Sequence, residues 1–398
     1  MADITLLLDS YINGVSFKYF FAEIPNYLFL FSVLSLLFLL NKLNNKEFIF
    51  FSIYCLSPFF FNYLLFDPSY FVDQRAYLFC TTSIKNGFDF INNQFCGFTF
   101  NPLSRQVANA SAVFSFIPIP TFLTVIAGAF INKFIIIFFY TFYLKKRIFN
   151  ENLIYIFLIP SMLLYSSLFL RDLPLTIASI IILIELIRGK WSSAPIIVAL
   201  LIYVILIKPQ NAIIFFIFGF VFLISRFFKE NYLFLFLSLA LIFVMSLIFQ
   251  NIILTTINFY VRAFAVEDGA TLDSLTTMYE YKSIFFLYLG IVPNFLKALF
   301  VPFPWDSSGL FQLFQSIENI FIAAAFIFLI FLIFQRKNIS SKLNTIYLVI
   351  YFLGTGMAMY GTIIFNEGSL VRYKFSIVMP FIFALLSLLY VDPREDAK

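Results

Sequence analysis

The sequence predicts an all-α, polytopic integral membrane protein. Hydrophobic residues make up 62% of the 398 residues and charged residues 12%, whereas soluble globular domains average roughly 45–50% and about 25%. The mean hydropathy of the chain is +0.95. A soluble fold has too little interior to bury this much apolar surface, and helices are the usual way for such a chain to cross a lipid bilayer.

About eleven apolar runs, within a range of roughly 10–13, approach the 20 residues that a helix needs to cross a bilayer. Cytoplasmic loops collect Lys and Arg. Placing the basic clusters near 145–147, 188–190, 226–229 and 336–342 inside puts the C-terminus inside and the N-terminus outside. The predicted spans are 22–40, 48–66, 121–144, 153–170, 173–187, 194–207, 211–225, 232–250, 318–335, 344–364 and 375–390.

This alternation leaves two long segments on the outer face, at about 67–120 and 251–317. The apolar stretches 104–120 and 283–301 within them are interrupted by prolines, so we expect interfacial or re-entrant helices there. No stretch has the composition of a soluble domain, and we expect residues 1–398 to form a single transmembrane domain. Because long loops on one face tend to carry function, we expect the outer face to be the working face.

Two absences narrow the chemistry. The chain has no histidine and only three cysteines, Cys55, Cys80 and Cys96, without CxxC spacing. An imidazole base, a His-ligated metal and a Ser-His-Asp triad are therefore excluded, and zinc and iron–sulfur sites are disfavoured. We expect no metal, no cofactor and no nucleic-acid partner. Cys80 and Cys96 share one outer segment and could be bridged, but the sequence does not show whether they are close enough.

The first outer segment opens with Asp67 and contains Asp73, Arg75 and Tyr77 just beyond the second span. A carboxylate at the membrane surface beside an arginine and aromatic rings can act as a general base toward a hydroxyl group, and Asp73 is our candidate. Alternatively, these residues form a solvated loop in which carboxylates offset nearby arginines.

Basic residues also stand at predicted outer ends of spans, where the positive-inside rule disfavours them. Arginine and lysine there would suit phosphate oxygens; the alternative is snorkelling of the side chains toward the interface. The second outer segment carries Arg262 among mixed charges and aromatics, a pattern that suits either a carbohydrate or an ordinary loop. The residues at span ends are Arg171 with Asp172, Lys208, and Arg372 with Tyr373 and Lys374.

Several short motifs carry a resemblance to a known family. These are the acid and tyrosine at Asp73 and Tyr77, the segment PSMLLYSSLFLRD ending at Arg171–Asp172, the Lys-Pro pair at 208–209, and GSLVRYKFSIVMP with Arg372. The pattern resembles bacterial polysaccharide polymerases of the Wzy and EpsG type, and more distantly membrane glycosyltransferases of the GT-C class. The chain has Lys208 where relatives often have arginine.

The resemblance implies an enzyme at the periplasmic face of the bacterial inner membrane that transfers a growing glycan from undecaprenyl pyrophosphate to the next lipid-linked repeat unit. It implies Asp73, Arg372 and Arg171 as catalytic residues. The implied partners are the lipid-linked oligosaccharide and membrane lipid, with a flippase and a chain-length regulator as further candidates. The implied substrate-binding residues are Arg75, Tyr77, Asp172, Lys208, Arg262, Tyr373 and Lys374.

Three alternatives stay open at this point. The chain could be a GT-C transferase that uses a sugar on polyprenyl phosphate, an O-antigen ligase, or a flippase for lipid-linked glycans. Transporters tend to have internal repeats and ionisable groups near the membrane midplane. The predicted spans look nearly free of charge at their centres, which favours chemistry at the outer surface over transport.

Overall fold

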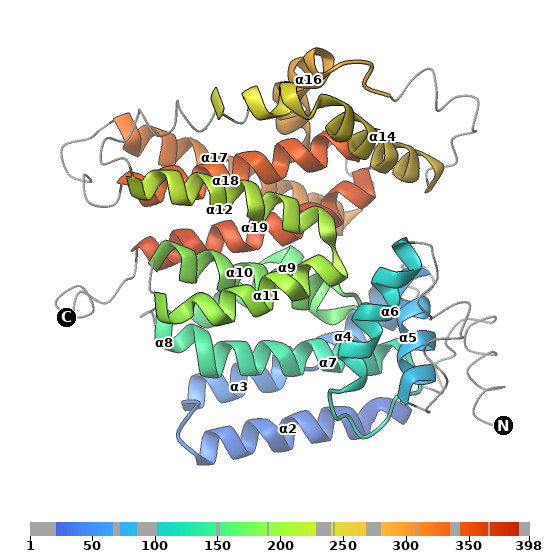
Figure 1. Cartoon of the computed structure of the whole chain (residues 1–398). Helices are drawn as coiled ribbons and strands as arrows, with labels where there is room; N and C mark the ends of the chain where they lie inside the picture. Colours follow the sequence, from blue (N-terminus) through green and yellow to red (C-terminus); the bar gives the residue numbers. More distant parts are fainter. Residues whose placement is uncertain are drawn as a thin grey trace. The chain divides into compact units, whose positions relative to one another are not determined.

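The computed structural model confirms an all-α protein (Figure 1): the part of the chain that it describes contains sixteen α-helices and no strand. Four helical stretches are long and apolar enough to cross a membrane, which indicates a multi-pass membrane protein: Phe21–Leu39, Val125–Arg147, Gln312–Phe331 and Gly368–Ser387. The residues described are 21–66, 72–85, 102–148, 152–188, 191–227, 240–241, 243–267, 280–306, 309–334, 343–364 and 367–389.

The chain divides into two compact units, which are described separately. Unit 1 comprises residues 1–177, 206–208 and 389–398, and unit 2 comprises residues 178–205 and 209–388. The expectation of a single transmembrane domain stays a prediction. The helices of unit 1 are α2 (Ile24–Leu39), α3 (Asn45–Tyr54), α4 (Ser57–Phe59), α5 (Val72–Lys85), α6 (Pro102–Ser115), α7 (Val125–Phe138), α8 (Lys145–Arg147), α9 (Pro160–Ser167) and the start of α10 (Asp172–Arg188).

Helix α7 is the central element of unit 1. It continues through the π-helix η4 (Phe139–Leu144) into α8, and it packs against α2, α4, α5 and α9. Apart from Asn132 and Lys133, its sequence is apolar on every side, as expected for a helix enclosed by other helices. Thr124 begins the helix by accepting a hydrogen bond from the Ile126 N–H at 3.2 Å.

Polar contacts define the two ends of unit 1. The described residues of the predicted inner loops lie together, because Lys145 pairs with Glu47 at 2.8 Å and Lys46 donates to Asn152 at 3.0 Å. At the other end, Glu23 beside α2 accepts the Thr124 N–H at 2.8 Å. Helices α2 and α7 therefore begin at one end of unit 1 and run in the same direction.

The segment 153–170 was expected to be one helical span, and this expectation is wrong in detail. The structure has a 3₁₀ segment, η5 (Leu153–Leu158), followed by the eight-residue helix α9 and an extended stretch. The reason is Pro160, which has no N–H to continue a helix but is well suited to start one. The segment still follows α7, from Phe157 beside Tyr140 to Phe169 beside Gly128.

Unit 2 is organised around α18 (Leu343–Ile363), which packs against α12, α14, α16 and α17. Helix α16 runs without interruption through Pro293, and the expectation that this segment is interfacial or re-entrant stays a prediction. Its close packing on α18 and the hydrogen bond from Asn294 to the Tyr281 hydroxyl at 3.1 Å hold it across this point. The other helices of unit 2 are α11 (Ala194–Ile207, whose last turn falls in unit 1), α12 (Pro209–Phe227), α14 (Gln250–Glu267), α16 (Ile284–Phe300), α17 (Leu310–Phe334) and α19 (Glu367–Leu389).

Gly361 should be essential for the packing of α18 on α16. A β-carbon at this position would lie 2.0 Å from the backbone oxygen of Asn294, whereas a β-carbon at Gly354 on the same helix would meet nothing within 4 Å. We therefore expect Gly361→Ala to destabilise the protein by about 1–3 kcal/mol. The matched control Gly354→Ala should stay within about 0.5 kcal/mol of the wild type. Thermal unfolding of the detergent-purified variants measures both effects, and equal stability of the two would contradict this packing.

Candidate functional site

The central feature of unit 1 is a break between α9 and α10. Residues 168–171, which we call the break, leave helical geometry at Leu168, whose φ is −109° and ψ is 153°. The whole stretch is buried. Backbone N–H and C=O groups that are removed from both helix and water need other hydrogen-bond partners, so such an interruption requires polar side chains around it.

Three amide side chains supply these partners, and we call Asn62, Gln74 and Asn132 the amide clamp. Asn62, in the π-helix η3 (Phe60–Leu65), donates to the Ser167 carbonyl at 2.7 Å. Asn132 on α7 donates to the carbonyls of Leu168 at 2.7 Å and Leu170 at 3.3 Å. Gln74 on α5 accepts the Phe169 N–H at 2.6 Å. The amide clamp thus fixes the backbone that leads into Arg171 and Asp172.

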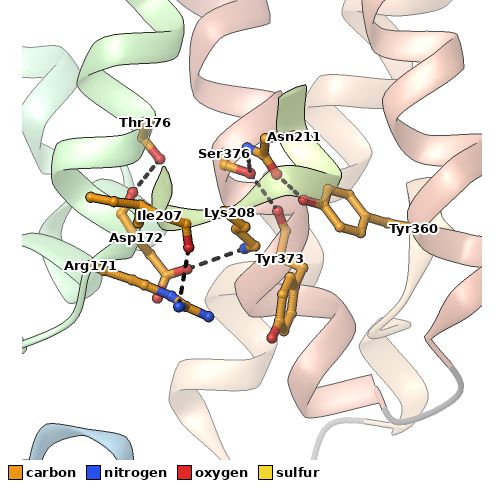
Figure 2. A network of polar contacts seen from close by, with 9 residues as sticks. All are labelled: Arg171, Asp172, Thr176, Ile207, Lys208, Asn211, Tyr360, Tyr373 and Ser376. Carbon is orange, nitrogen blue, oxygen red and sulfur yellow. Dashed lines mark hydrogen bonds and ion pairs between the residues drawn. The ribbon is translucent and has the colours of Figure 1, made fainter. Parts of the chain in front are cut away.

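A buried charged cluster follows the break (Figure 2). Asp172 stands in the first turn of α10 and pairs with Lys208 at 3.4 Å, and both side chains are 1% exposed. Arg171 is 7% exposed and donates to the Ile207 carbonyl at 3.2 Å. Snorkelling would leave the charged groups of Arg171 and Lys208 exposed, so the structure is inconsistent with that alternative for these two residues.

The electrostatics of this cluster favour an anion. Arg171, Asp172 and Lys208 together carry a net charge of +1, because two cations accompany one carboxylate. The start of a helix also carries a partial positive charge, which favours anions and opposes cations. Lys208 directly follows α11, and Arg171 donates to the carbonyl of the last residue of α11, so the negative end of that helix stabilises both cations. Two cations beside one carboxylate form an arrangement suited to a phosphate group.

Lys133 is a residue that the sequence analysis missed. It stands near the middle of the predicted span 121–144 and its side chain is 0% exposed, so the expectation of nearly uncharged span centres is wrong for this helix. Its ammonium group donates to Ser166 at 2.7 Å and to Ser167 at 3.1 Å, and it lies 3.6 Å from the centre of the Tyr54 ring. The pair Asn132–Lys133 inside an otherwise apolar run was the signal that could have identified it.

Helix α5 carries the residues expected to contact the acceptor. The structure places Asp73 in the first turn of this helix with an exposed side chain, and Arg75 is partly buried. Tyr77 differs from expectation, because its ring is 1% exposed and packs against Phe114 and Phe169 at centroid distances of 6.2 and 6.0 Å. The Tyr77 ring therefore supports the break from within the core and offers no open face for a sugar to stack on.

In unit 2, α19 carries Arg372 and Tyr373 as partly exposed residues and Lys374 as a buried one. Lys374 donates to the Val301 carbonyl and to Asn319 Oδ1, the latter at 2.7 Å, so it fastens α19 to the chain after α16. This is a structural contact at a residue predicted to bind substrate.

A polar network surrounds the start of α19 within unit 2 (Figure 2). Asn211 donates to the Ser376 hydroxyl at 2.9 Å and accepts from the Tyr360 hydroxyl. The Tyr360 and Tyr373 rings lie 5.6 Å apart. This network fixes the turn of α19 that carries Arg372.

Arg262, on α14 of unit 2, is paired with Glu280 at an exposed position. An exposed ion pair of this kind contributes little to stability, so it neither supports nor opposes a role in binding sugar. The part of the chain that the structure describes contains no group of three or more Cys, Asp or Glu side chains arranged to hold a metal ion. Cys80 is disulfide-bonded, Cys55 is a buried free thiol, and Cys96 lies outside the described residues.

The structure therefore brings together Arg171, Asp172 and Lys208, and it keeps Arg372, Tyr373 and Lys374 adjacent on one helix. No protein-family model, no curated protein and no solved structure matches this chain. The resemblance to polysaccharide polymerases is untested by these comparisons and stays a prediction.

The Asp172–Lys208 pair should be coupled energetically. Asp172→Asn leaves the Lys208 ammonium buried without its carboxylate, and we expect a loss of roughly 3–5 kcal/mol of stability. Adding Lys208→Met removes the uncompensated charge, so the double variant should be more stable than Asp172→Asn alone. Lys146→Met, at an exposed lysine, serves as the control for loss of a positive charge. Additive effects in thermal unfolding would show that the pair is not coupled.

Proposed function

We propose that this chain is a membrane glycosyltransferase that polymerises lipid-linked oligosaccharide repeat units at the outer face of the bacterial inner membrane. The observation that carries the proposal is the buried cluster of Arg171, Asp172 and Lys208 at the start of α10. Such a cluster suits a phosphate or pyrophosphate group, and a substrate on undecaprenyl pyrophosphate would bring one to the membrane surface.

The proposed reaction is a glycosyl transfer. A hydroxyl oxygen of the incoming repeat unit attacks the anomeric carbon of the growing glycan, and the bond from that carbon to the pyrophosphate oxygen breaks. The electron pair leaves with undecaprenyl pyrophosphate, whose increasing negative charge Arg171 stabilises. Arg372, in unit 2, is proposed to bind a phosphate of the donor or acceptor lipid. The hydroxyl proton passes to Asp73, the exposed carboxylate on α5. The reaction needs no nucleotide sugar.

We further propose that the chain crosses the membrane about eleven times, with both catalytic segments outside. Support comes from unit 1, where the loops 41–47 and 145–152 lie at the same end and the starts of α2 and α7 lie at the other. Besides the four long apolar helices, four shorter ones over 194–207, 209–222, 284–300 and 348–363 are consistent with further spans.

Transport of the lipid-linked glycan is the second candidate function, and Lys133 is the observation that favours it. Ionisable residues inside a membrane span commonly mark transport pathways. However, two serine hydroxyls and the face of a tyrosine ring already surround the Lys133 ammonium. This environment fits a lysine that stabilises the end of α9, so the polymerase remains our proposal.

The proposed topology can be tested with reporter fusions. The alternation predicts that reporters inserted near residues 85, 270 and 369 are outside, and that reporters near residues 146, 228 and 338 are inside. Paired phosphatase and fluorescent-protein fusions measure the two locations. An inner location for residue 270 would contradict the alternation and remove the second outer segment from the proposed site.

We expect polymerisation to require an arginine side chain at position 372. Arg372→Ala loses the charge, and Arg372→Lys keeps the charge but loses the planar fork that binds two phosphate oxygens at once. We expect both variants to lose about 2–4 kcal/mol of transition-state stabilisation, or about 10²–10³ in rate. The measurement is the surface-polysaccharide ladder of a deletion strain of the native host that expresses each variant at a matched membrane level.

The matched control is Arg147→Ala, since Arg147 lies at the predicted inner face and should leave the ladder unchanged. Loss of the long chains with single repeat units retained is the outcome expected for a polymerase. A lipid A core oligosaccharide that is truncated before any repeat unit is added would favour the single-sugar transferase. Polymer that stays on its lipid carrier and is never attached to this core oligosaccharide would favour the ligase. Repeat units accumulating on the inner side would favour the flippase. A normal ladder in Arg372→Ala would contradict the site.

A further inference from the structure

We propose that Gln74, which no motif singled out, binds substrate: its side-chain NH₂ group donates to a phosphate oxygen of the lipid-linked pyrophosphate at the start of α10. This inference rests on the proposed function, because it names a further binding residue of the same site. The evidence for it is the buried amide group of Gln74, whose oxygen has a hydrogen-bond partner and whose nitrogen has none among the described residues.

The oxygen end of the Gln74 amide has a structural partner. Gln74 is 0% exposed, and its Oε1 accepts the Phe169 N–H of the break at 2.6 Å. This hydrogen bond fixes which way the amide faces, because a flipped amide would set a donor against the Phe169 N–H. Because Nε2 belongs to the same amide group as this oxygen, it also lies close to the break.

The nitrogen end of the same amide has no partner. Among the residues that the structure describes, Gln74 Nε2 makes no hydrogen bond although it is fully buried. A buried donor without an acceptor is rare in folded proteins, because it has lost its hydrogen bonds to water without replacement. A group that arrives with the substrate can supply the missing acceptor.

The chemistry around the break identifies that acceptor as an anion. The break leads directly into Arg171, Asp172 and the start of α10, and Lys208 lies against Asp172. Two cations, a helix start and an amide donor give a site rich in donors, and a pyrophosphate supplies many acceptor oxygens together with negative charge.

Gln74→Glu separates binding from structure. A glutamate keeps an oxygen to accept the Phe169 N–H, so the break stays capped, but it replaces the Nε2 donor by an oxygen that repels phosphate. If Gln74 only caps the break, this variant should bind pyrophosphate as well as the wild type does. If Gln74 contacts phosphate, the folded variant should lose affinity, whereas Gln106→Glu, which buries the same carboxylate at another glutamine, should not.

The experiment uses the full chain in nanodiscs and isothermal titration calorimetry. The probes are farnesyl pyrophosphate, inorganic pyrophosphate, and farnesol as the control for partitioning into lipid. We expect the wild type to bind farnesyl pyrophosphate, and Gln74→Glu to weaken this binding at least tenfold. Gln106→Glu places the same charge change at another buried glutamine, on α6, and should leave the affinity within about twofold of the wild type. Gln74→Met removes the Nε2 donor, and also the Oε1 that accepts the Phe169 N–H, without adding charge, and it is the second variant if Gln74→Glu does not fold.

Wild-type affinity in Gln74→Glu or in a folded Gln74→Met would overturn the inference. So would an equal loss in Gln106→Glu, or no binding of either pyrophosphate by the wild type. Equal affinity for the inorganic and farnesyl probes would support the anion site and show that the lipid adds nothing to recognition; tighter binding of the farnesyl probe would assign the site to a lipid-linked substrate. Binding that depends on Gln74 together with a normal ladder in the deletion strain, which lacks this chain, would refute the polymerase and leave the anion site standing.

Discussion

The backbone at residues 168–171 has to find hydrogen-bond partners in a place where neither helix nor water supplies them. Inside a membrane protein this constraint is severe, because an unpaired backbone group costs far more in apolar surroundings than in water. Asn62, Gln74 and Asn132 meet it from three different elements. The rest of unit 1 depends on this arrangement, since α5, η3 and α7 have to pack where their amide groups can reach the break.

The same constraint explains why charge is tolerated so deep in unit 1. A helix that restarts after a break presents its positive end to the interior, and Asp172 in the first turn of α10 is favoured there. Lys208 and Arg171 then stand beside a carboxylate and a backbone carbonyl, which partly offset the cost of their burial. In this view the break is the reason that the chain can hold a basic cluster suited to a pyrophosphate.

For Lys133, the sequence and the structure suggest different roles. By sequence alone, a lysine in mid-span suggests an ion or substrate pathway. In the structure its ammonium group lies at the carboxyl-terminal end of α9, where it donates to Ser166 and Ser167, and cations stabilise the carboxyl-terminal ends of helices. Lys374 is a similar case, because its ammonium group donates a hydrogen bond to the carbonyl of Val301, directly after α16. Lys133 and Lys374 thus hold segments together where helices end.

The sequence by itself determined the helical class, the membrane character and the approximate place of most helices, because apolar runs of this length have one stable form in a bilayer. It also placed Arg171, Asp172 and Lys208 at span ends, since charges there interrupt an apolar pattern. Only the tertiary structure decided that these three residues are buried together, that Tyr77 belongs to the core, and that Gln74 touches the break. These facts depend on contacts between residues about 35–95 positions apart in the chain, and hydropathy reports only how a segment partitions between water and lipid, without indicating which segments meet.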